Sequence, residues 1–146
     1  MVSQSPETKT APETPVRAPS AVPVDDSVLP FEVNALDLRG RLTRLGPALD
    51  DILTKHDYPV PVGKLLGEAI VLTTLLGTSL KFEGRFILQT RTDGPVSFLV
   101  VDFKSPDRLR AYARYDAARL KDGQSSGDLL GKGHLAMTID QGADMS

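Results

Sequence analysis

Apolar and polar residues alternate in the second half of the chain, which predicts β-structure there. Between residues 108 and 115 every second side chain is apolar, the period of a strand with one buried face. Residues 85–92 and 134–139 are predicted as further strands. The run 96–103 is almost continuously apolar, so we expect a central strand covered on both faces. The pair Asp93-Gly94, a strong hairpin turn signal, separates this run from residues 85–92.

A helical pattern precedes these strands. Apolar side chains between residues 62 and 80 cover nearly every side of a helix, which predicts a helix buried in the core. Lys64 and Glu68, four positions apart, form its only clearly polar side. Gly67 and Gly77 each weaken such a helix by about 1 kcal/mol relative to alanine, so we expect them to permit close packing by neighbours.

The pattern before this helix predicts one strand and one short helix. Residues 31–45 approximate an alternation of period two, and Gly40 within them predicts a bulge or bend. Pro47 suits the first turn of a helix, which we expect to end near His56. The first 24 residues hold five prolines among Ser, Thr and Ala, a composition that buries too little apolar surface to offset its ordering entropy.

These elements predict an α+β fold in which an antiparallel sheet packs on a long buried helix. We expect residues 1–27 to form a disordered tail rich in Pro, Ser and Thr, and residues 28–146 to form one domain. About 120 residues are enough for a small domain to bury most of its apolar surface.

Composition narrows the classes of partner. The net charge of −2 and the pI of about 5.6 do not imply steering toward nucleic acid. The chain has no cysteine, which excludes disulfides and thiolate metal sites within it. The start lacks a secretory signal pattern, and the longest apolar-rich run is about 12 residues where a bilayer needs roughly 20. We therefore expect a cytoplasmic protein with no membrane partner.

The few side chains capable of chemistry lack the spacing that catalysis or metal binding requires. His56 and Asp57 are adjacent, and His134 is the other histidine, which favours turn formation and capping over a general base or a metal site. No nucleophile elbow surrounds a serine. Gly131 and Gly133 resemble part of a dinucleotide loop but lead into a predicted strand instead of a helix. We predict no catalytic, cofactor-binding or metal-ligating residue, and hence no enzyme.

Two surfaces are candidates for binding. Arg108, Arg110 and Arg114 share one strand face with Tyr112, where they could meet phosphates while the ring stacks on a base; the alternative is a solvated sheet face. The apolar run on the preceding strand is either core or, if the sheet is covered on one side, an interaction surface. The candidate contact residues of that run are Phe98, Leu99, Val100, Val101 and Phe103.

Taken together, the motifs resemble the bacterial redox-regulated thirty-three-kilodalton heat-shock chaperone family. In chain order they are Leu38-Arg39-Gly40, His56-Asp57-Tyr58-Pro59 with Pro61-Val62, the helix ending Leu75-Leu76-Gly77-Thr78-Ser79-Leu80-Lys81-Phe82-Glu83-Gly84, Asp93-Gly94-Pro95, the strand containing Arg114, and Gly131-Lys132-Gly133. Each is weak alone, and their order and spacing are the specific signal. The resemblance covers residues 28–142.

The resemblance implies an ATP-independent holdase that binds unfolded client proteins and prevents their aggregation, with a possible homodimer. The five candidate contact residues would then face clients or a second subunit. In the family, four cysteines of a C-terminal module bind zinc when reduced, and their oxidation exposes apolar surface, since metal binding and folding are coupled to redox state. This chain carries no such cysteine, so we expect no cofactor in it and no redox switch. The alternative is a nucleic-acid-binding module that uses the Arg108, Arg110 and Arg114 face, although we expect no nucleic-acid partner.

Overall fold

The computed structural model describes residues 25–80 and 83–142. Residues 1–24, and with them most of the predicted tail, lie outside the described residues, as do residues 81–82 of the resemblance motif and residues 143–146. The last three residues of the predicted tail belong to the described fold. Ser27 opens the first strand, Asp25 pairs with Arg44 of the second strand, and Asp26 binds the start of the first helix.

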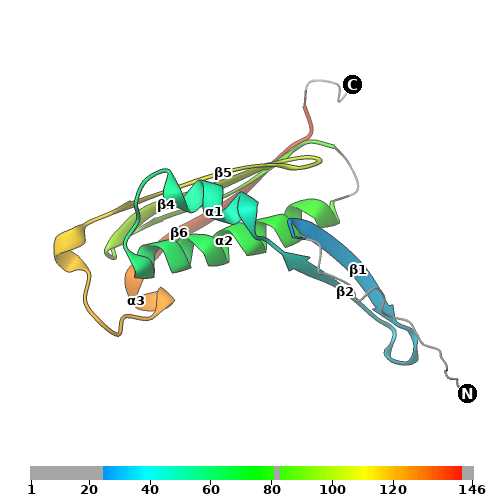
Figure 1. The fold of residues 1–146 in the computed structure, drawn as a ribbon, viewed down its shortest axis with the longest axis horizontal. Helices are drawn as coiled ribbons and strands as arrows, with labels where there is room; N and C mark the ends of the chain where they lie inside the picture. Colours follow the sequence, from blue (N-terminus) through cyan, green and yellow to red (C-terminus); the bar gives the residue numbers. More distant parts are fainter. Residues whose placement is uncertain (1–24, 81–82, 143–146) are drawn as a thin grey trace, which may run out of the picture.

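The described residues form an α+β fold, as predicted (Figure 1). The strands β5, β4, β3 and β6, in this order, form one antiparallel sheet, and β1 and β2 form a separate antiparallel pair. The elements are β1 (Ser27–Val33), β2 (Leu38–Arg44), α1 (Pro47–Thr54), α2 (Val60–Ser79), β3 (Arg85–Thr92), β4 (Val96–Lys104), β5 (Arg108–Tyr115), α3 (Ser126–Leu130) and β6 (Gly133–Asp140).

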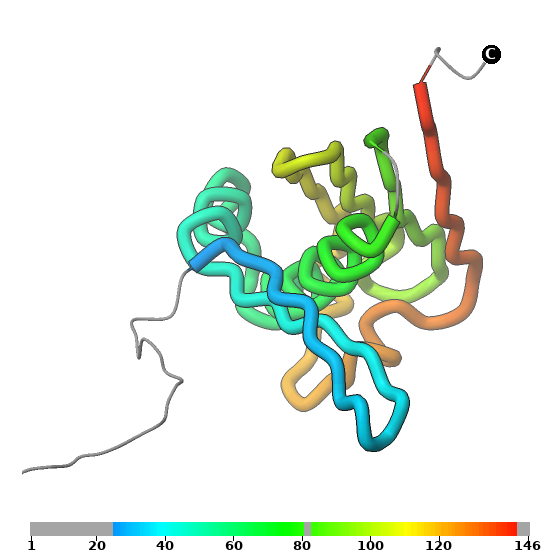
Figure 2. The backbone as a smooth tube through the Cα atoms, turned by 90° about the vertical axis from the view of Figure 1, so that its right-hand side faces the viewer, coloured from blue at the N-terminus to red at the C-terminus, as the bar shows by residue number. Residues whose placement is uncertain are grey.

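The core lies between α2 and one face of the four-stranded sheet, which we call the inner face. Figure 2 shows α2 running along this face, with α1 on one flank and β6 at the opposite edge. The side chains buried there come from α1, α2, α3, β3, β4 and β5, and none comes from β6. The largest fully buried ones are Leu66, Ile70, Leu99, Val62, Val96 and Val101.

Helix α2 is the predicted core helix, but it is not buried on every side. Val62, Leu66 and Ile70 are fully buried, whereas Leu72 is 46% exposed and Val60 is 84% exposed. The reason is that the sheet covers one side of α2, while α1 and β2 contact only parts of the remaining surface. This helix is long and apolar enough to cross a membrane by composition, yet its buried side packs on the sheet as the core helix of a soluble domain does.

Strand β4 is central, as predicted, but only one of its faces is covered. Leu99, Val101 and Phe103 are buried against α2, while Phe98 and Val100 point to the opposite face and are partly exposed. We call this opposite face of the four-stranded sheet the outer face. No described element packs on it, so the prediction of a strand covered on both faces was wrong.

The predicted single strand over residues 31–45 is a hairpin. β1 and β2 are joined by a 3-10 turn at Asn34–Leu36, and Asp37 adopts left-handed backbone geometry (φ 50°) to close it. Gly40 makes no bulge, because it pairs in register with Phe31, whose ring occupies the space where a β-carbon would lie. The alternation of the sequence therefore belonged to two strands joined by a turn.

Helix α1 is capped from outside its own sequence. The carboxylate of Asp26 accepts hydrogen bonds from the backbone N–H of Gly46 at 2.9 Å and of Ala48 at 3.1 Å. Gly46 has no side chain to supply a cap, so the acceptor comes from 20 residues earlier in the chain. The neighbouring Asp25 forms an ion pair with Arg44 at 2.7 Å. The hairpin and α1 are thereby joined at one point.

Candidate functional site

The structure divides the five predicted contact residues between two faces of β4. Leu99, Val101 and Phe103 belong to the hydrophobic core, where their relative exposure is 1%, 0% and 4%. Phe98 and Val100 lie on the outer face and are partly exposed. Phe98 and Val100 can therefore contact a partner on the outer face, whereas the three core residues cannot do so while the sheet is intact.

The outer face collects cations from three strands. Arg108, Arg110, Tyr112 and Arg114 of β5 lie on it together, as the alternation predicted. Cross-strand register places Arg85, Arg91 and Lys104 on the same face. Its carboxylates are Asp102 and Asp140. Six cations against two carboxylates give this face a net charge of +4, although the whole chain carries −2.

The cations occupy both ends of the outer face. At one end Asp102, which is largely buried, pairs with Arg110 at 2.7 Å and with Arg85 at 3.2 Å. At the other end the guanidinium groups of Arg91 and Arg114 lie over the ring of Phe98, 4.9 and 5.4 Å from its centroid. The middle of the face is uncharged. Its residues are Ile87, Gln89, Val100, Tyr112, Ala136 and Thr138.

Strand β6 presents an uncovered apolar row on the inner face. Leu135, Met137 and Ile139 pair with Thr90, Leu88 and Phe86 of β3, and so point to the side on which α2 lies. They remain 56%, 58% and 50% exposed because α2 covers β3, β4 and β5 but does not extend over β6. The outer edge of β6 pairs with no described strand. We call these three residues the β6 row.

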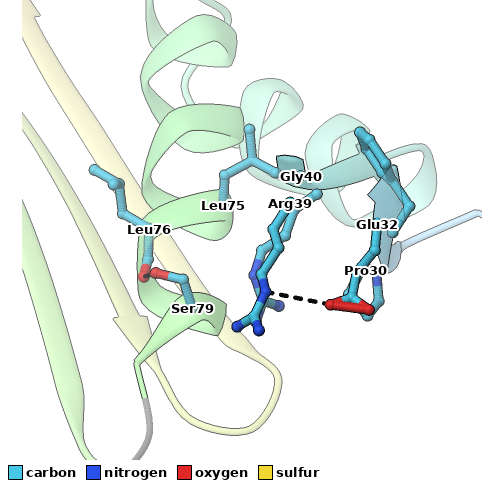
Figure 3. Close-up of a pocket in the computed structure, with 9 residues that line it drawn as sticks. Pro30, Glu32, Arg39, Gly40, Leu75, Leu76 and Ser79 are labelled. Carbon is cyan, nitrogen blue, oxygen red and sulfur yellow. Dashed lines mark hydrogen bonds and ion pairs between the residues drawn. The ribbon is translucent and has the colours of Figure 1, made fainter. Parts of the chain in front are cut away.

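The β1–β2 hairpin is a second apolar surface. One of its faces carries exposed side chains that meet across the two strands. They are Leu29, Phe31, Val33, Leu38 and Leu42. Between the hairpin and the end of α2 lies a cleft of about 840 Å³, seen in Figure 3. On its hairpin side Arg39 forms an exposed ion pair with Glu32 at 3.2 Å. Leu75, Leu76 and Ser79 of α2 form its opposite wall.

A third apolar surface is a groove along α1 and α2. It has a volume of about 830 Å³ and is lined mainly by apolar side chains. Leu49 and Leu53 of α1 line it together with Val71 and Leu72 of α2, and Tyr58 is a further lining residue. The polar side of α2, Lys64 and Glu68, also lines this groove. Glu68 accepts a hydrogen bond from Ser126 at 2.8 Å, which joins α2 to α3.

The His56 segment has a packing role. The ring of His56 lies 5.6 Å from that of Tyr58 and 5.5 Å from that of Tyr112. The hydroxyl of Tyr58 accepts a hydrogen bond from the backbone N–H of Ala113 at 3.1 Å and so closes part of the β5 edge. Burial raises the pKa of the Tyr58 phenol above its ordinary value, against the opposing effect of this hydrogen bond. Asp57 has left-handed backbone geometry (φ 49°), consistent with a turn.

Two glycine motifs that are distant in sequence meet at one turn. Asp93 accepts a hydrogen bond from the N–H of Lys132 at 2.7 Å, and the N–H of Gly94 donates to the carbonyl of Leu130 at 2.9 Å. A β-carbon on Gly94 would lie 2.4 Å from that carbonyl oxygen, and Gly131 has a φ of 75°. The glycines of residues 131–133 thus close the fold around the β3–β4 turn, and their position before a strand excludes the dinucleotide-loop geometry.

The residues present do not fit the zinc site that the family resemblance implies. The chain has no cysteine, and the described residues contain no group of three or more His, Cys, Asp or Glu side chains that could hold a metal ion. His134 of β6 pairs with Arg91 on the outer face. His56 lies beside Tyr112 of β5, at the opposite edge of the sheet. A thiolate zinc centre therefore has no ligands in this chain.

Comparison with known proteins identifies the family. The family model described as Hsp33 protein matches residues 26–146. The chain belongs to the Hsp33 family. The 33 kDa chaperonin of Caulobacter vibrioides is 48% identical over 134 residues, which cover 88% of this chain and 44% of that protein. The 33 kDa chaperonin of a Pseudomonas fluorescens strain is 40% identical over 119 residues, covering 82% and 40%.

The fold of the Hsp33 family is also matched by a solved structure. The crystal structure of the 33 kDa chaperonin, a heat shock protein 33 homolog, from Thermotoga maritima aligns with a TM-score of 0.69 at 18% identity. The alignment covers 80% of this chain and 42% of that one. The resemblance drawn from the order of motifs is confirmed, and the chain spans less than half the length of the Hsp33 relatives it matches.

Proposed function

We propose that this protein is a chaperone of the holdase type, which binds unfolded client proteins and prevents their aggregation without ATP and without a covalent step. Support comes from membership of the Hsp33 family and from the relatives named 33 kDa chaperonin. Because the chain spans about 44% of the first of these relatives, the activity is a proposal for these residues.

The observation that carries the proposal is the uncovered apolar surface. Exposed apolar patches on soluble proteins mark interaction sites when their members are contiguous. The β6 row and the apolar face of the hairpin are both contiguous by strand register. Burying the exposed half of each side chain of the β6 row against a client contributes about 1 kcal/mol per residue. This attraction needs no particular client sequence, which suits a protein that holds many unfolded chains.

On the outer face we keep two of the predicted contact residues, Phe98 and Val100, as client contacts. Their partial exposure and their place in the sheet support this assignment. We do not propose Leu99, Val101 or Phe103 as direct contacts, because a client would have to displace α2 from the sheet to reach them.

We further propose a homodimer and a cytoplasmic location. The hairpin face offers a contiguous exposed apolar surface that a second copy could bury, and the unpaired edge of β6 offers backbone groups to which another strand could pair. Multi-angle light scattering of the purified chain tests the dimer. A molar mass of one chain over a tenfold range of concentration would contradict it.

Redox regulation, as the family resemblance implies it, needs cysteines that this chain does not have. We propose that the holding activity of these residues is independent of thiol oxidation. Methionine is the remaining oxidisable side chain of the apolar surface, since Met137 is 58% exposed within the β6 row. A Met137→Leu variant, which keeps volume and apolarity, therefore belongs in any peroxide experiment.

The experiment is light scattering of a chemically denatured client diluted into buffer with and without the chain, under reductant and under peroxide. We expect suppression of aggregation under reductant, and equal suppression under peroxide for Met137→Leu. Circular dichroism of the same samples establishes that the chain is folded. A folded chain that leaves aggregation unchanged under both conditions would overturn the proposal for these residues.

A further inference from the structure

The charge of the outer face is unlike that of the rest of the molecule. It carries six cations against two carboxylates, while the whole chain carries 17 basic and 19 acidic residues. The remaining surface is therefore net acidic. The positive field of the outer face attracts anionic groups and repels cationic ones over about one Debye length, roughly 8–10 Å at physiological salt. A surface that captured clients by apolarity alone would need no such separation of charge.

We infer that the outer face selects clients by charge: it binds unfolded protein segments that carry carboxylates on both sides of an apolar stretch. This rests on the proposed holdase function and names the class of client that the outer face takes.

Four of the six cations have no carboxylate within ion-pair distance among the described residues. Only Arg110 and Arg85 are engaged, both with Asp102. The other four are Arg91, Lys104, Arg108 and Arg114. Two stand at each end of the outer face, since Lys104 pairs across the sheet with Arg108, while Arg91 and Arg114 flank Phe98. Each end can therefore receive at least one anionic group.

The anion that fits best is a carboxylate of a protein segment. Guanidinium groups form paired, charge-assisted hydrogen bonds with carboxylates and phosphates alike, so the aromatic rings decide between protein and nucleic acid. Single-stranded nucleic acid needs free ring faces on which bases stack. The ring of Phe98 has two guanidinium groups over it, and that of Tyr112 packs edge-on with His56 at 5.5 Å. Phe98 is therefore no open stacking platform, which leaves Tyr112, in contact with His56, as the single ring that could stack on a base.

The spacing of the two cationic ends sets the length of the segment. Arg91 lies six positions after Arg85 in β3, a separation of about 20 Å at the rise of a strand. An extended segment spans this distance with about six residues, and a helical one with about 13. Between the ends the face offers Ile87 and Val100 for apolar contact. The fitting segment is thus acidic at both ends and apolar between them.

The test is fluorescence anisotropy with labelled synthetic peptides of one design. Each peptide has the same apolar centre and carries Glu, Gln or Lys pairs at both ends. A single-stranded oligonucleotide of equal charge to the Glu peptide forms a fourth probe. We expect the Glu peptide to bind at least about tenfold more tightly than the Lys peptide at about 50 mM salt, and this ratio to fall severalfold at about 500 mM.

Variants connect the preference to the outer face. Arg91→Gln/Arg114→Gln and Lys104→Gln/Arg108→Gln should each reduce the ratio of Glu to Lys affinity severalfold, with binding of the Gln peptide nearly unchanged. A matched control, Arg41→Gln/Lys121→Gln, removes two exposed cations outside the outer face and should leave the ratio as in the unsubstituted chain. Circular dichroism and thermal unfolding of all variants show whether they remain folded.

Four outcomes would overturn the inference. Equal binding of the three peptides would leave an apolar holdase without charge selection, and light scattering would still report its activity. A ratio that falls equally in the control variant would assign the preference to overall charge. Tighter binding of the oligonucleotide than of the Glu peptide, lost in the outer-face variants, would favour the nucleic-acid module instead. If no peptide binds and aggregation is not suppressed, the proposed function fails as well.

Discussion

Single residues in this fold hold together elements that are distant in sequence, and Tyr58 is the plainest case. Its hydroxyl binds the backbone N–H of Ala113, 55 residues away, on the open edge of β5. Replacing it with phenylalanine leaves a partly buried N–H without that acceptor. We expect Tyr58→Phe to lower the free energy of unfolding by about 1 kcal/mol, measured by denaturant titration. An unchanged midpoint with an unchanged slope would contradict this role.

The same residue makes the stability of the fold depend on pH in the alkaline range. Burial raises the pKa of the Tyr58 phenol above its value in the unfolded chain, near 10. The neutral phenol therefore contributes stability that is fully present below pH 10 and is lost as the pH rises through the folded pKa. Phenolate absorbance should show one of the three tyrosines titrating above its ordinary range, in a late phase. In Tyr58→Phe this late phase should be absent.

Two glycines of α2 that look alike in sequence have different surroundings. A β-carbon at Gly77 would lie 2.4 Å from the ring of Phe103, whereas one at Gly67 would meet Leu49 at an ordinary 3.8 Å. We expect Gly77→Ala to destabilise by about 1–3 kcal/mol through overpacking. Gly67→Ala should stabilise by up to about 1 kcal/mol through helix propensity. Thermal unfolding of the pair measures both, and equal shifts of the same sign would contradict the packing that we describe.

At the scale of elements, α1 depends on a carboxylate supplied by the segment before β1. Asp26 receives the N–H groups of Gly46 and Ala48, which is the role of an N-cap side chain. We expect Asp26→Ala to cost about 1 kcal/mol of stability. Asp26→Asn keeps an acceptor oxygen and tolerates the left-handed backbone at this position (φ 57°), so it should cost less. Urea unfolding compares them, and equal losses would show that the cap is not the cause.

A second element, α3, makes its own cap. Ser125 and Asp128 form a capping box, and the hydrogen bonds from the Ser125 backbone and side chain lower the pKa of the Asp128 carboxyl. Since the folded pKa lies below the unfolded one, the contribution of this box is present above the unfolded pKa near 3.8 and is lost as the pH falls below it. The box positions Leu129 in the core and Leu130 beside Gly94.

At the scale of the whole molecule, the two faces of the sheet differ in how far other elements cover them. The inner face is covered by α2 as far as β3 and then continues uncovered as the β6 row. We expect Leu135→Ser/Met137→Ser/Ile139→Ser to weaken suppression of client aggregation at least severalfold, because it removes apolar surface that clients would bury. Light scattering with a denatured client measures the effect.

The matched control replaces exposed alanines that belong to neither face of the sheet. Ala117→Ser/Ala118→Ser alters residues of the 3-10 turn Ala117–Arg119 and leaves both the β6 row and the outer face intact. This control should suppress aggregation as well as the unsubstituted chain. Equal suppression by both sets of variants would show that the β6 row takes no part in holding clients, and would direct attention to the hairpin face.

The sequence by itself determined the family, the α+β class and most elements of the fold. The order of the motifs identified the family, and the periods of α2 and of β3, β4 and β5 placed these elements within a residue or two. These features are readable because periodicity and turn residues act locally, through the geometry of neighbouring peptide units. For the same reason the sequence predicted one strand where the structure has β1 and β2. The alternation of apolar and polar residues continues through the short turn between the two strands, so it does not show where the chain reverses.

Only the tertiary structure decided which faces are covered. Alternation along β4 shows that its two sides can differ, but burial depends on what packs across each side, and that is set by elements far away in sequence. For this reason three of the five predicted contact residues lie in the core and two on the outer face. The gathering of six cations on that face likewise depends on the register of three strands, because a charge acts through its distance in space and not along the chain.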